Sequence, residues 1–180
     1  MISFFELHDC IYVIIMTSQT KSLEKQLMKQ DPESFIQFDL NGQELLCRVL
    51  RVHDTDTITV GFKLKSNFYR KNLRITGIDS PELHSRNAKE AKLCRLGREY
   101  LKQRYLNKII LVKMGPNDKY GRTLADIFDK DSNEQITAKL VECKFARAYG
   151  GDLKKVPWDK TEVLEGIAIA GGMNLVDPGK

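Results

Sequence analysis

Three short segments of the chain carry the side chains that phosphodiester chemistry needs. Their sequences are DTDT at residues 54–57, RITGIDSPE at 74–82 and DKYGR at 118–122. Carboxylates are preferred ligands of hard cations such as Ca²⁺, and arginine presents a planar fork of donors to phosphate. Segments that supply both groups indicate a site for phosphodiester chemistry.

The first two segments must lie on neighbouring strands for their acids to meet. Asp54 and Asp56 are two residues apart, so on a strand their side chains point to the same face. Two carboxylates on one face repel unless a cation or solvent relieves them. A plain acidic turn is the alternative interpretation. Asp79 adds a third acid from the adjacent strand, which favours a site.

A break in the strand is needed between Arg74 and Asp79, because residues five apart on a regular strand face opposite sides. Gly77 offers a position for a strand end or a bulge, and Pro81 fixes the exit of the chain ahead of Glu82. The alternative is a surface salt bridge between Arg74 and Asp79 at a strand end.

The third segment offers a turn and two side chains for a nucleotide. Gly121 permits the turn, Arg122 can contact a phosphate through two donors, and Tyr120 can stack on a base. Half-buried packing is the alternative for Tyr120. The histidines lack metal-ligand spacing, and His84 is interpreted as a loop residue.

Apolar patterning predicts short strands interrupted by helices. Asn41-Gly42 is a tight-turn signal between strands at 38–40 and 44–50. Further strands are predicted at 57–63, 68–76, 109–114 and 123–128, and helices at 88–106, 137–145 and 162–170. This order indicates an α+β fold, a five-stranded β-barrel of the OB type with packed helices.

Bulk properties narrow the class of protein. The chain has 180 residues, enough for one domain with a core plus extensions. A net charge of +5 and a pI of about 9.0 favour a polyanionic partner. The four cysteines contain no C-x-x-C pair, which argues against zinc, and Cys47 and Cys94 are predicted to be buried.

At this point residues 47–149 resemble the staphylococcal nuclease (thermonuclease) family. The resemblance rests on five blocks in the family's order: 54–57, 74–82, Glu90-Ala91, 118–122 and 140–146. It implies an OB-fold barrel with helices and a calcium-dependent phosphodiesterase site.

The same resemblance implies a calcium site. By position, Asp56 and Asp79 would be its carboxylate ligands, and Ser80 would contribute its main-chain carbonyl. The family usually has Thr at this position, and the change leaves a backbone ligand intact. Asp54 matches an outer-shell carboxylate near the metal.

Roles around the substrate follow in the same way from the resemblance. Arg74 and Arg122 match the two arginines on the scissile phosphate, and Glu82 matches the general base that activates water. Lys119 and Tyr120 match residues near the bound nucleotide.

Two positions depart from the family pattern. The family often has Gly where this chain has Thr55, so the turn between Asp54 and Asp56 is open to change. It also has Gly where this chain has Lys144, near a helix end where a positive φ is often required. Lysine can adopt that conformation at modest cost.

The segments outside the resemblance are assigned from composition. Residues 1–34 are predicted to form an N-terminal extension, 35–150 the nuclease domain and 151–180 a C-terminal extension. The apolar run at 10–16 is short of the roughly 20 residues that span a bilayer. No basic residue precedes it, so it is a poor signal peptide, which favours an intracellular protein with no membrane contact. Either Met16 is the true start, or this run is a short packing or interfacial segment.

Taken together, the resemblance implies a calcium-dependent endonuclease that hydrolyses DNA or RNA with little sequence preference and leaves 3′-phosphates. Mg²⁺ or Mn²⁺ in place of Ca²⁺ stays open, because oxygen ligands suit all three ions. The alternatives are a catalytically weak module that binds nucleic acid and a structural barrel with a coincidental acidic rim. The presence of all the acids and arginines argues against the first, and the second would require three unrelated matches. No protein partner or oligomeric state is inferred.

Overall fold

The computed structural model describes residues 20–34, 39–150 and 157–179, and divides into two units, Met1–Phe38 and Asp39–Lys180. In the first unit residues 20–27 are helical, and a 3₁₀ turn, η1, spans Pro32–Ser34. The helix therefore ends before Asp31-Pro32, as proline predicts. The apolar run at 10–16 lies outside the described residues.

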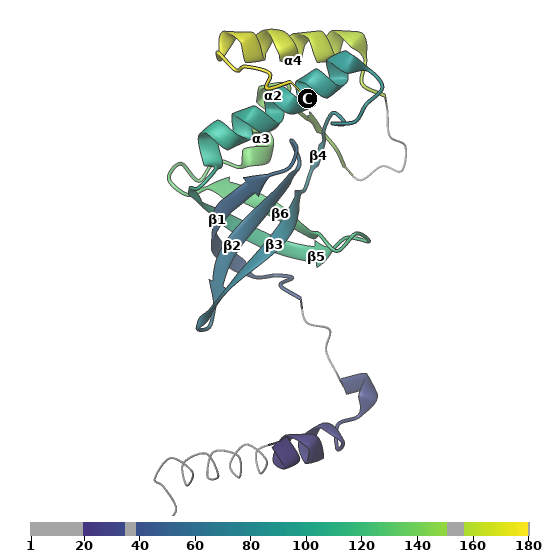
Figure 1. Cartoon of the computed structure of the whole chain (residues 1–180), viewed down its shortest axis with the longest axis vertical. Coiled ribbons are helices and arrows are strands. Elements are labelled where there is room, and N and C mark those ends of the chain that lie inside the picture. Colours follow the sequence, from purple (N-terminus) through teal and green to yellow (C-terminus); the bar gives the residue numbers. More distant parts are fainter. Residues whose placement is uncertain (1–19, 35–38, 151–156, 180) are drawn as a thin grey trace, which may run out of the picture. The chain divides into compact units, whose positions relative to one another are not determined.

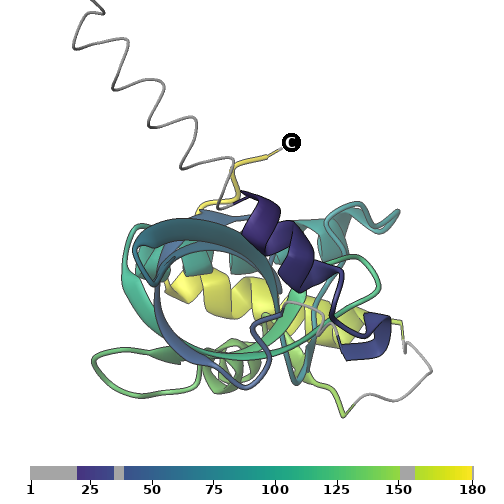
Figure 2. The same ribbon diagram turned by 90° about the horizontal axis from the view of Figure 1, so that it is seen from below.

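The second unit is built on a closed β-barrel with the strand order β1-β2-β3-β6-β5 (Figures 1 and 2). Its strands are β1 (Glu44–Val52), β2 (Thr57–Leu64), β3 (Asn67–Ile75), β5 (Ile109–Asn117) and β6 (Thr123–Asp129). β3 and β6 pair in parallel, whereas the other neighbours are antiparallel. The predicted five-stranded α+β barrel of the OB type is confirmed.

Alternation of side chains along the strands explains why the barrel closes around an apolar centre. On β1, Cys47 and Val49 are buried, whereas Leu46, Arg48 and Leu50 are exposed on the outer face. The register shifts between Val49 and Arg51, a bulge that bends the strand.

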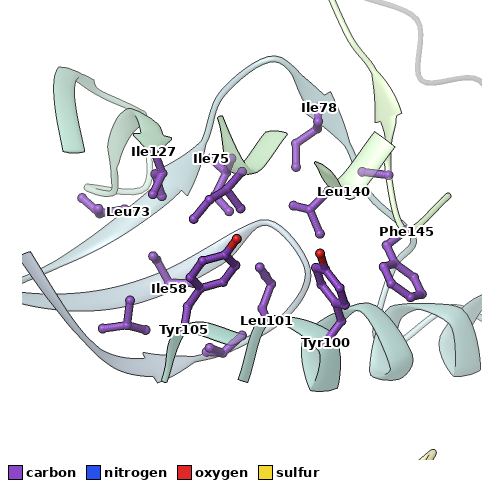
Figure 3. Close-up of a cluster of buried hydrophobic side chains, with 14 of the residues drawn as sticks. Ile58, Leu73, Ile75, Ile78, Tyr100, Leu101, Tyr105, Ile127, Leu140 and Phe145 are labelled. Carbon is purple, nitrogen blue, oxygen red and sulfur yellow. The ribbon is translucent and has the colours of Figure 1, made fainter. Parts of the chain in front are cut away.

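One end of the barrel is covered by α2 (Ala88–Tyr105). Asn87 caps this helix by accepting a hydrogen bond from the Lys89 amide at 3.0 Å. Figure 3 shows Tyr100, Leu101 and Tyr105 of α2 in one cluster with strand residues such as Ile58, Leu73 and Ile75. Both predicted buried cysteines, Cys47 and Cys94, are buried.

The predicted turn at Asn41-Gly42 forms, but the strand ahead of it does not. The Gln43 amide donates to Leu40 O at 3.0 Å, and Gly42 has a φ of +80°. Residues 39 and 40 belong to no strand, and Phe38 lies outside the described residues. The turn is held instead by β5. The Gly42 amide donates to Met114 O and the Met114 amide donates to Gln43 O, both at 2.8 Å.

Two short elements and two further helices complete this unit. They are β4 (Ile78–Asp79), α3 (Ile136–Glu142), β7 (Arg147–Ala148) and α4 (Lys160–Gly172). β4 and β7 pair antiparallel away from the barrel sheet. Asp159 and Glu162 form a capping box at the start of α4.

The C-terminal segment packs on α2 within the same unit. Val163 and Ala170 of α4 are buried in the core, and a Cβ at Gly166 would lie 2.6 Å from Leu93. Arg95 of α2 pairs with Asp177 through two hydrogen bonds of 2.6 and 2.8 Å. Residues 157–179 therefore share the core of the barrel unit. Within the described ranges, no helix has the length and apolarity to cross a membrane.

α3 ends three residues before the predicted helix because Lys144 takes a left-handed conformation with a φ of +58°. The Phe145 amide donates to Leu140 O at 2.9 Å and the Lys144 amide to Val141 O at 3.0 Å. This pair of bonds is a Schellman motif, in which the left-handed residue is usually glycine.

Replacing Lys144 by Gly is expected to raise the free energy of unfolding by about 0.5–1 kcal/mol, since the left-handed conformation costs an L-residue roughly 1–2 kcal/mol and glycine offsets part of this through unfolded-chain entropy. Urea denaturation measures the change. Lys144→Ala keeps the Cβ and should leave stability nearly unchanged. An equal gain in both variants would contradict the backbone explanation.

Candidate active site

A pocket of about 840 Å³ lies where the ends of β1 and β3 and one side of α2 meet β4 and the segment after it. Its walls include Asp54, Asp56, Arg74, Asp79, Ser80, Glu82 and Arg122. The structure therefore brings together most of the predicted site residues from three separate segments. Lys119 and Tyr120 are not among the lining residues.

Asp56 accepts hydrogen bonds from three directions. Ser80 Oγ and Thr57 Oγ1 donate to its two carboxylate oxygens at 2.7 Å each, and Arg74 Nη2 lies 3.2 Å from Oδ2. Burial alone would favour the protonated carboxyl, but the Arg74 charge and the two hydroxyl donors outweigh it and lower the pKa of Asp56. Asp56 is therefore held as an anion.

Asp54 stands next to Asp56 on the same side of the turn. Its Oδ1 accepts the Asp56 amide at 3.1 Å. Burial and the neighbouring Asp56 charge raise the pKa of Asp54 to about 6. The two carboxylates thus line one pocket, with the pKa of Asp54 raised and that of Asp56 lowered.

Thr55, where the family often has Gly, anchors the acidic turn on α2. Its side chain is fully buried, and its hydroxyl donates to Cys94 O at 3.1 Å. The residue is not among those with positive φ in the described chain. Gly97 makes this contact possible, because a Cβ there would lie 2.7 Å from Thr55 Oγ1. Threonine is therefore accommodated without displacing Asp54 or Asp56 from the pocket.

Gly97→Ala is expected to lower the free energy of unfolding by about 1–3 kcal/mol, since the added methyl group overpacks the buried Thr55. The shift of the acidic turn should also reduce any activity of the pocket. Urea denaturation of Gly97→Ala, Thr55→Gly and the double variant measures the coupling. Thr55→Gly should recover stability in the Gly97→Ala background, and strictly additive losses would contradict the contact.

The predicted break after Arg74 is present. β3 ends at Ile75, Gly77 has a φ of +73°, and β4 starts at Ile78. Arg74 Nη2 donates to Ile78 O at 2.9 Å and also pairs with Asp56. The alternative salt bridge between Arg74 and Asp79 is not formed.

Asp79 is instead paired with Arg147, a residue that the sequence did not single out. β4 and β7 place the two residues opposite each other, and Arg147 Nε and Nη2 donate to Asp79 Oδ2 at 3.0 and 2.8 Å. The Arg147 guanidinium also lies 4.6 Å from the Trp158 ring and 3.5 Å from Glu162. Asp79 is therefore linked to the C-terminal segment.

Glu82 is exposed on the segment that leads from the pocket to α2. Its amide donates to Glu90 Oε1 at 3.1 Å, and Ser85 Oγ donates to Glu90 Oε2 at 2.7 Å. Glu90 lies in the first turn of α2 and holds this loop to the helix. The conformation of the loop around Glu82 is thus set by a second carboxylate.

Arg122 is fixed by the turn that precedes β6. Its Nε donates to Asp118 Oδ2 at 2.8 Å and its Nη1 to Thr57 Oγ1 at 3.1 Å. The Thr57 hydroxyl donates in turn to Asp56, so it connects the arginine with the acid. Tyr120 is 72% exposed rather than half-buried, and its ring lies 5.1 Å from Lys119 Nζ.

Several cations of the pocket were missed by the sequence analysis. Arg98 and Lys102 of α2 line it, and their spacing of four on a helix could have indicated a shared face. Arg98 Nε is buried without a hydrogen-bond partner in the described part of the chain. His84, interpreted as a loop residue, lies in the loop and also lines the pocket.

Comparison with known proteins agrees with this geometry. A family model described as staphylococcal nuclease homologue matches residues 72–166, more than half of the chain. A thermonuclease from Staphylococcus hyicus is 31% identical over 110 residues, which is 60% of this chain and 62% of the relative. The chain thus aligns with less than two thirds of that relative's length. On the strength of the family match, the chain belongs to the staphylococcal nuclease family.

Proposed function

We propose that the protein is a metal-dependent endonuclease that hydrolyses phosphodiester bonds of DNA or RNA with little sequence preference. The observation that carries the proposal is the convergence of acids and arginines from three segments on one pocket. Membership of a nuclease family supports it.

The donor set of the pocket fits a hard cation. Asp56 and Asp79 would bind it through carboxylates and Ser80 through its main-chain carbonyl, with Asp54 nearby. Among the described residues, no group of three or more His, Cys, Asp or Glu is placed to hold a metal ion. The proposed set needs only two such side chains and leaves other positions to water and substrate.

Calcium, or Mg²⁺ or Mn²⁺ in its place, would supply positive charge beside the phosphate and orient the attacking water. Asp56 is already anionic in this structure because Arg74, Ser80 and Thr57 all stabilise its charge.

Three side chains would take the proton-transfer and charge-stabilising roles. Glu82 would accept the proton of the attacking water, since it lines the pocket and is exposed to solvent. Arg74 and Arg122 would donate hydrogen bonds to phosphate oxygens, on which negative charge develops in the transition state. Both guanidiniums are pre-oriented, Arg74 by Asp56 and Arg122 by Asp118.

A module that only binds nucleic acid is not favoured. A disturbed turn at Thr55 would favour such a module, but this turn keeps Asp54 and Asp56 in the pocket.

End-labelled single-stranded DNA and RNA of one sequence, incubated with the full chain and Ca²⁺, Mg²⁺ or Mn²⁺, test the proposal. We expect cuts at many positions and products that carry 3′-phosphates. Binding of both strands without cleavage in any of the three ions would overturn it in favour of a binding module.

A further inference from the structure

A groove of about 730 Å³ lies on the outer face of β1, β2 and β3. Apolar side chains that point away from the core line it, among them Leu46, Leu50, Phe68 and Ile109. Phe68 is 82% exposed, whereas its neighbour Tyr69 points to the opposite face of β3 and stacks on buried Phe62 with 6.0 Å between centroids. Large exposed apolar side chains clustered on one face mark an interaction surface.

Basic side chains border this outer-face groove. In the strand register Arg48 of β1 lies opposite Gly61 of β2, and Gly61 lies opposite Arg70 of β3. Gly61 has no side chain, and the Leu50 side chain lies over it, with Cδ1 3.1 Å from the position that a Cβ of Gly61 would take. Lys63 lies 5.9 Å from the Phe68 ring centroid. No acidic residue lines the groove, so its charge suits a polyanion.

The outer-face groove is continuous with the catalytic pocket. A second hollow of about 580 Å³ shares Leu50 and Arg70 with the groove. It shares Arg51 and His53 with the catalytic pocket and adds Lys71, again without an acid. An extended polyanion could therefore lie along the outer face and reach the acids and arginines at the far end.

We propose that the outer-face groove binds the part of a single-stranded nucleic acid that extends beyond the cleavage site. Bases would stack on Phe68, while Arg48 and Arg70 would contact phosphates. The β-strands that form the groove each extend roughly 25 Å. This length suits the several nucleotides that an OB fold covers. This inference deepens the proposed function and rests on it for the direction of the strand.

A single-stranded ligand is favoured over a membrane or a protein by two features. Basic side chains recur along the lining as far as the proposed phosphate site, and the most exposed apolar side chain of the groove is a flat aromatic ring, Phe68. Rings stack on any base, so such a surface adds affinity without sequence preference.

Binding in chelator tests the groove independently of catalysis. The full chain is titrated with labelled oligothymidylates of about 4 and about 16 nucleotides, the range of OB-fold site sizes. Phe68→Ala with Arg70→Ala should weaken binding of the longer strand by at least about tenfold, since stacking contributes about 1–3 kcal/mol per base. The matched control, Lys130→Ala with Val176→Ala, changes an exposed cation and an exposed apolar residue elsewhere and should have no effect.

Two further variants separate stacking from other uses of the surface. Phe68→Trp should retain binding of the longer strand, whereas Phe68→Leu should lose it although it stays apolar. Equal binding by all groove variants would overturn the proposal. The proposal would also be overturned if the groove variants kept oligonucleotide binding but lost binding to vesicles of phosphatidylserine and phosphatidylcholine. That result would assign the groove to a membrane. Failure of the chain to cleave would overturn the proposed function and leave this binding result standing.

Discussion

Glu82→Gln should lower turnover on single-stranded DNA by about 10²–10⁴-fold, the contribution typical of a positioned general base. Glutamine has nearly the same shape as glutamate but cannot accept the proton of the attacking water. The Glu82 amide and the Ser85 hydroxyl donate hydrogen bonds to the Glu90 carboxylate and so hold the loop around Glu82. These bonds do not involve the Glu82 carboxylate. Folding and strand binding should therefore be retained.

Initial rates at saturating substrate measure this effect, with affinity for the same strand determined in chelator. Glu165→Gln, an exposed change on α4 outside the pocket, serves as the matched control and should keep full turnover. Unchanged turnover in Glu82→Gln would remove this residue from the mechanism. A parallel loss of strand binding would point to a structural role for its carboxylate.

Arg122→Lys is expected to lower turnover by about 10²–10³-fold, the effect of removing one donor that stabilises developing charge. The guanidinium reaches Asp118 and Thr57 at the same time, at 2.8 and 3.1 Å. A lysine ammonium is a compact point charge without that planar fork, so it cannot hold both contacts and face a phosphate.

The comparison of kcat with KM distinguishes this role from simple electrostatic attraction. A charge-preserving change should affect KM little and kcat strongly if, as proposed, the lost donor acts on the transition state. Arg104→Lys is the matched control, since Arg104 lies over the Tyr100 ring and outside the pocket. Similar turnover in both variants would contradict a specific role for the Arg122 fork.

The barrel could be predicted because its information is local. Strand alternation, the Asn41-Gly42 turn and the glycine at residue 77 each depend on a few neighbouring residues, and all appear in the structure. The prediction of a short strand ahead of Asn41 was wrong because it, too, used only local information. Its local pattern suits a strand, but in the structure the barrel closes through β1 and β5 without it.

The site could be predicted only as far as its motifs extend. Asp56 and Arg74 lie in marked segments, and their contact follows from the pairing of Thr57 with Arg74. Arg147 follows Asp79 by 68 positions and belongs to no motif, so its pairing with Asp79 depends on the β4–β7 contact. Such a partner cannot be found without the tertiary structure.

The outer-face groove was hidden from the sequence for a related reason. Exposed residues of β1, β2 and β3 look ordinary one strand at a time, and only the register places Arg48 and Arg70 on either side of Gly61.

The most direct test of the account follows cleavage of one labelled single-stranded DNA by the full chain through three stages. Calcium is added first, then a chelator in excess, then calcium again in excess of the chelator. We predict that cutting starts, stops and resumes in the same sample, because the proposed ligands Asp56, Asp79 and Ser80 would bind the ion reversibly. Cutting that continues in chelator, or a folded chain that never cuts, would contradict metal-dependent hydrolysis in this pocket.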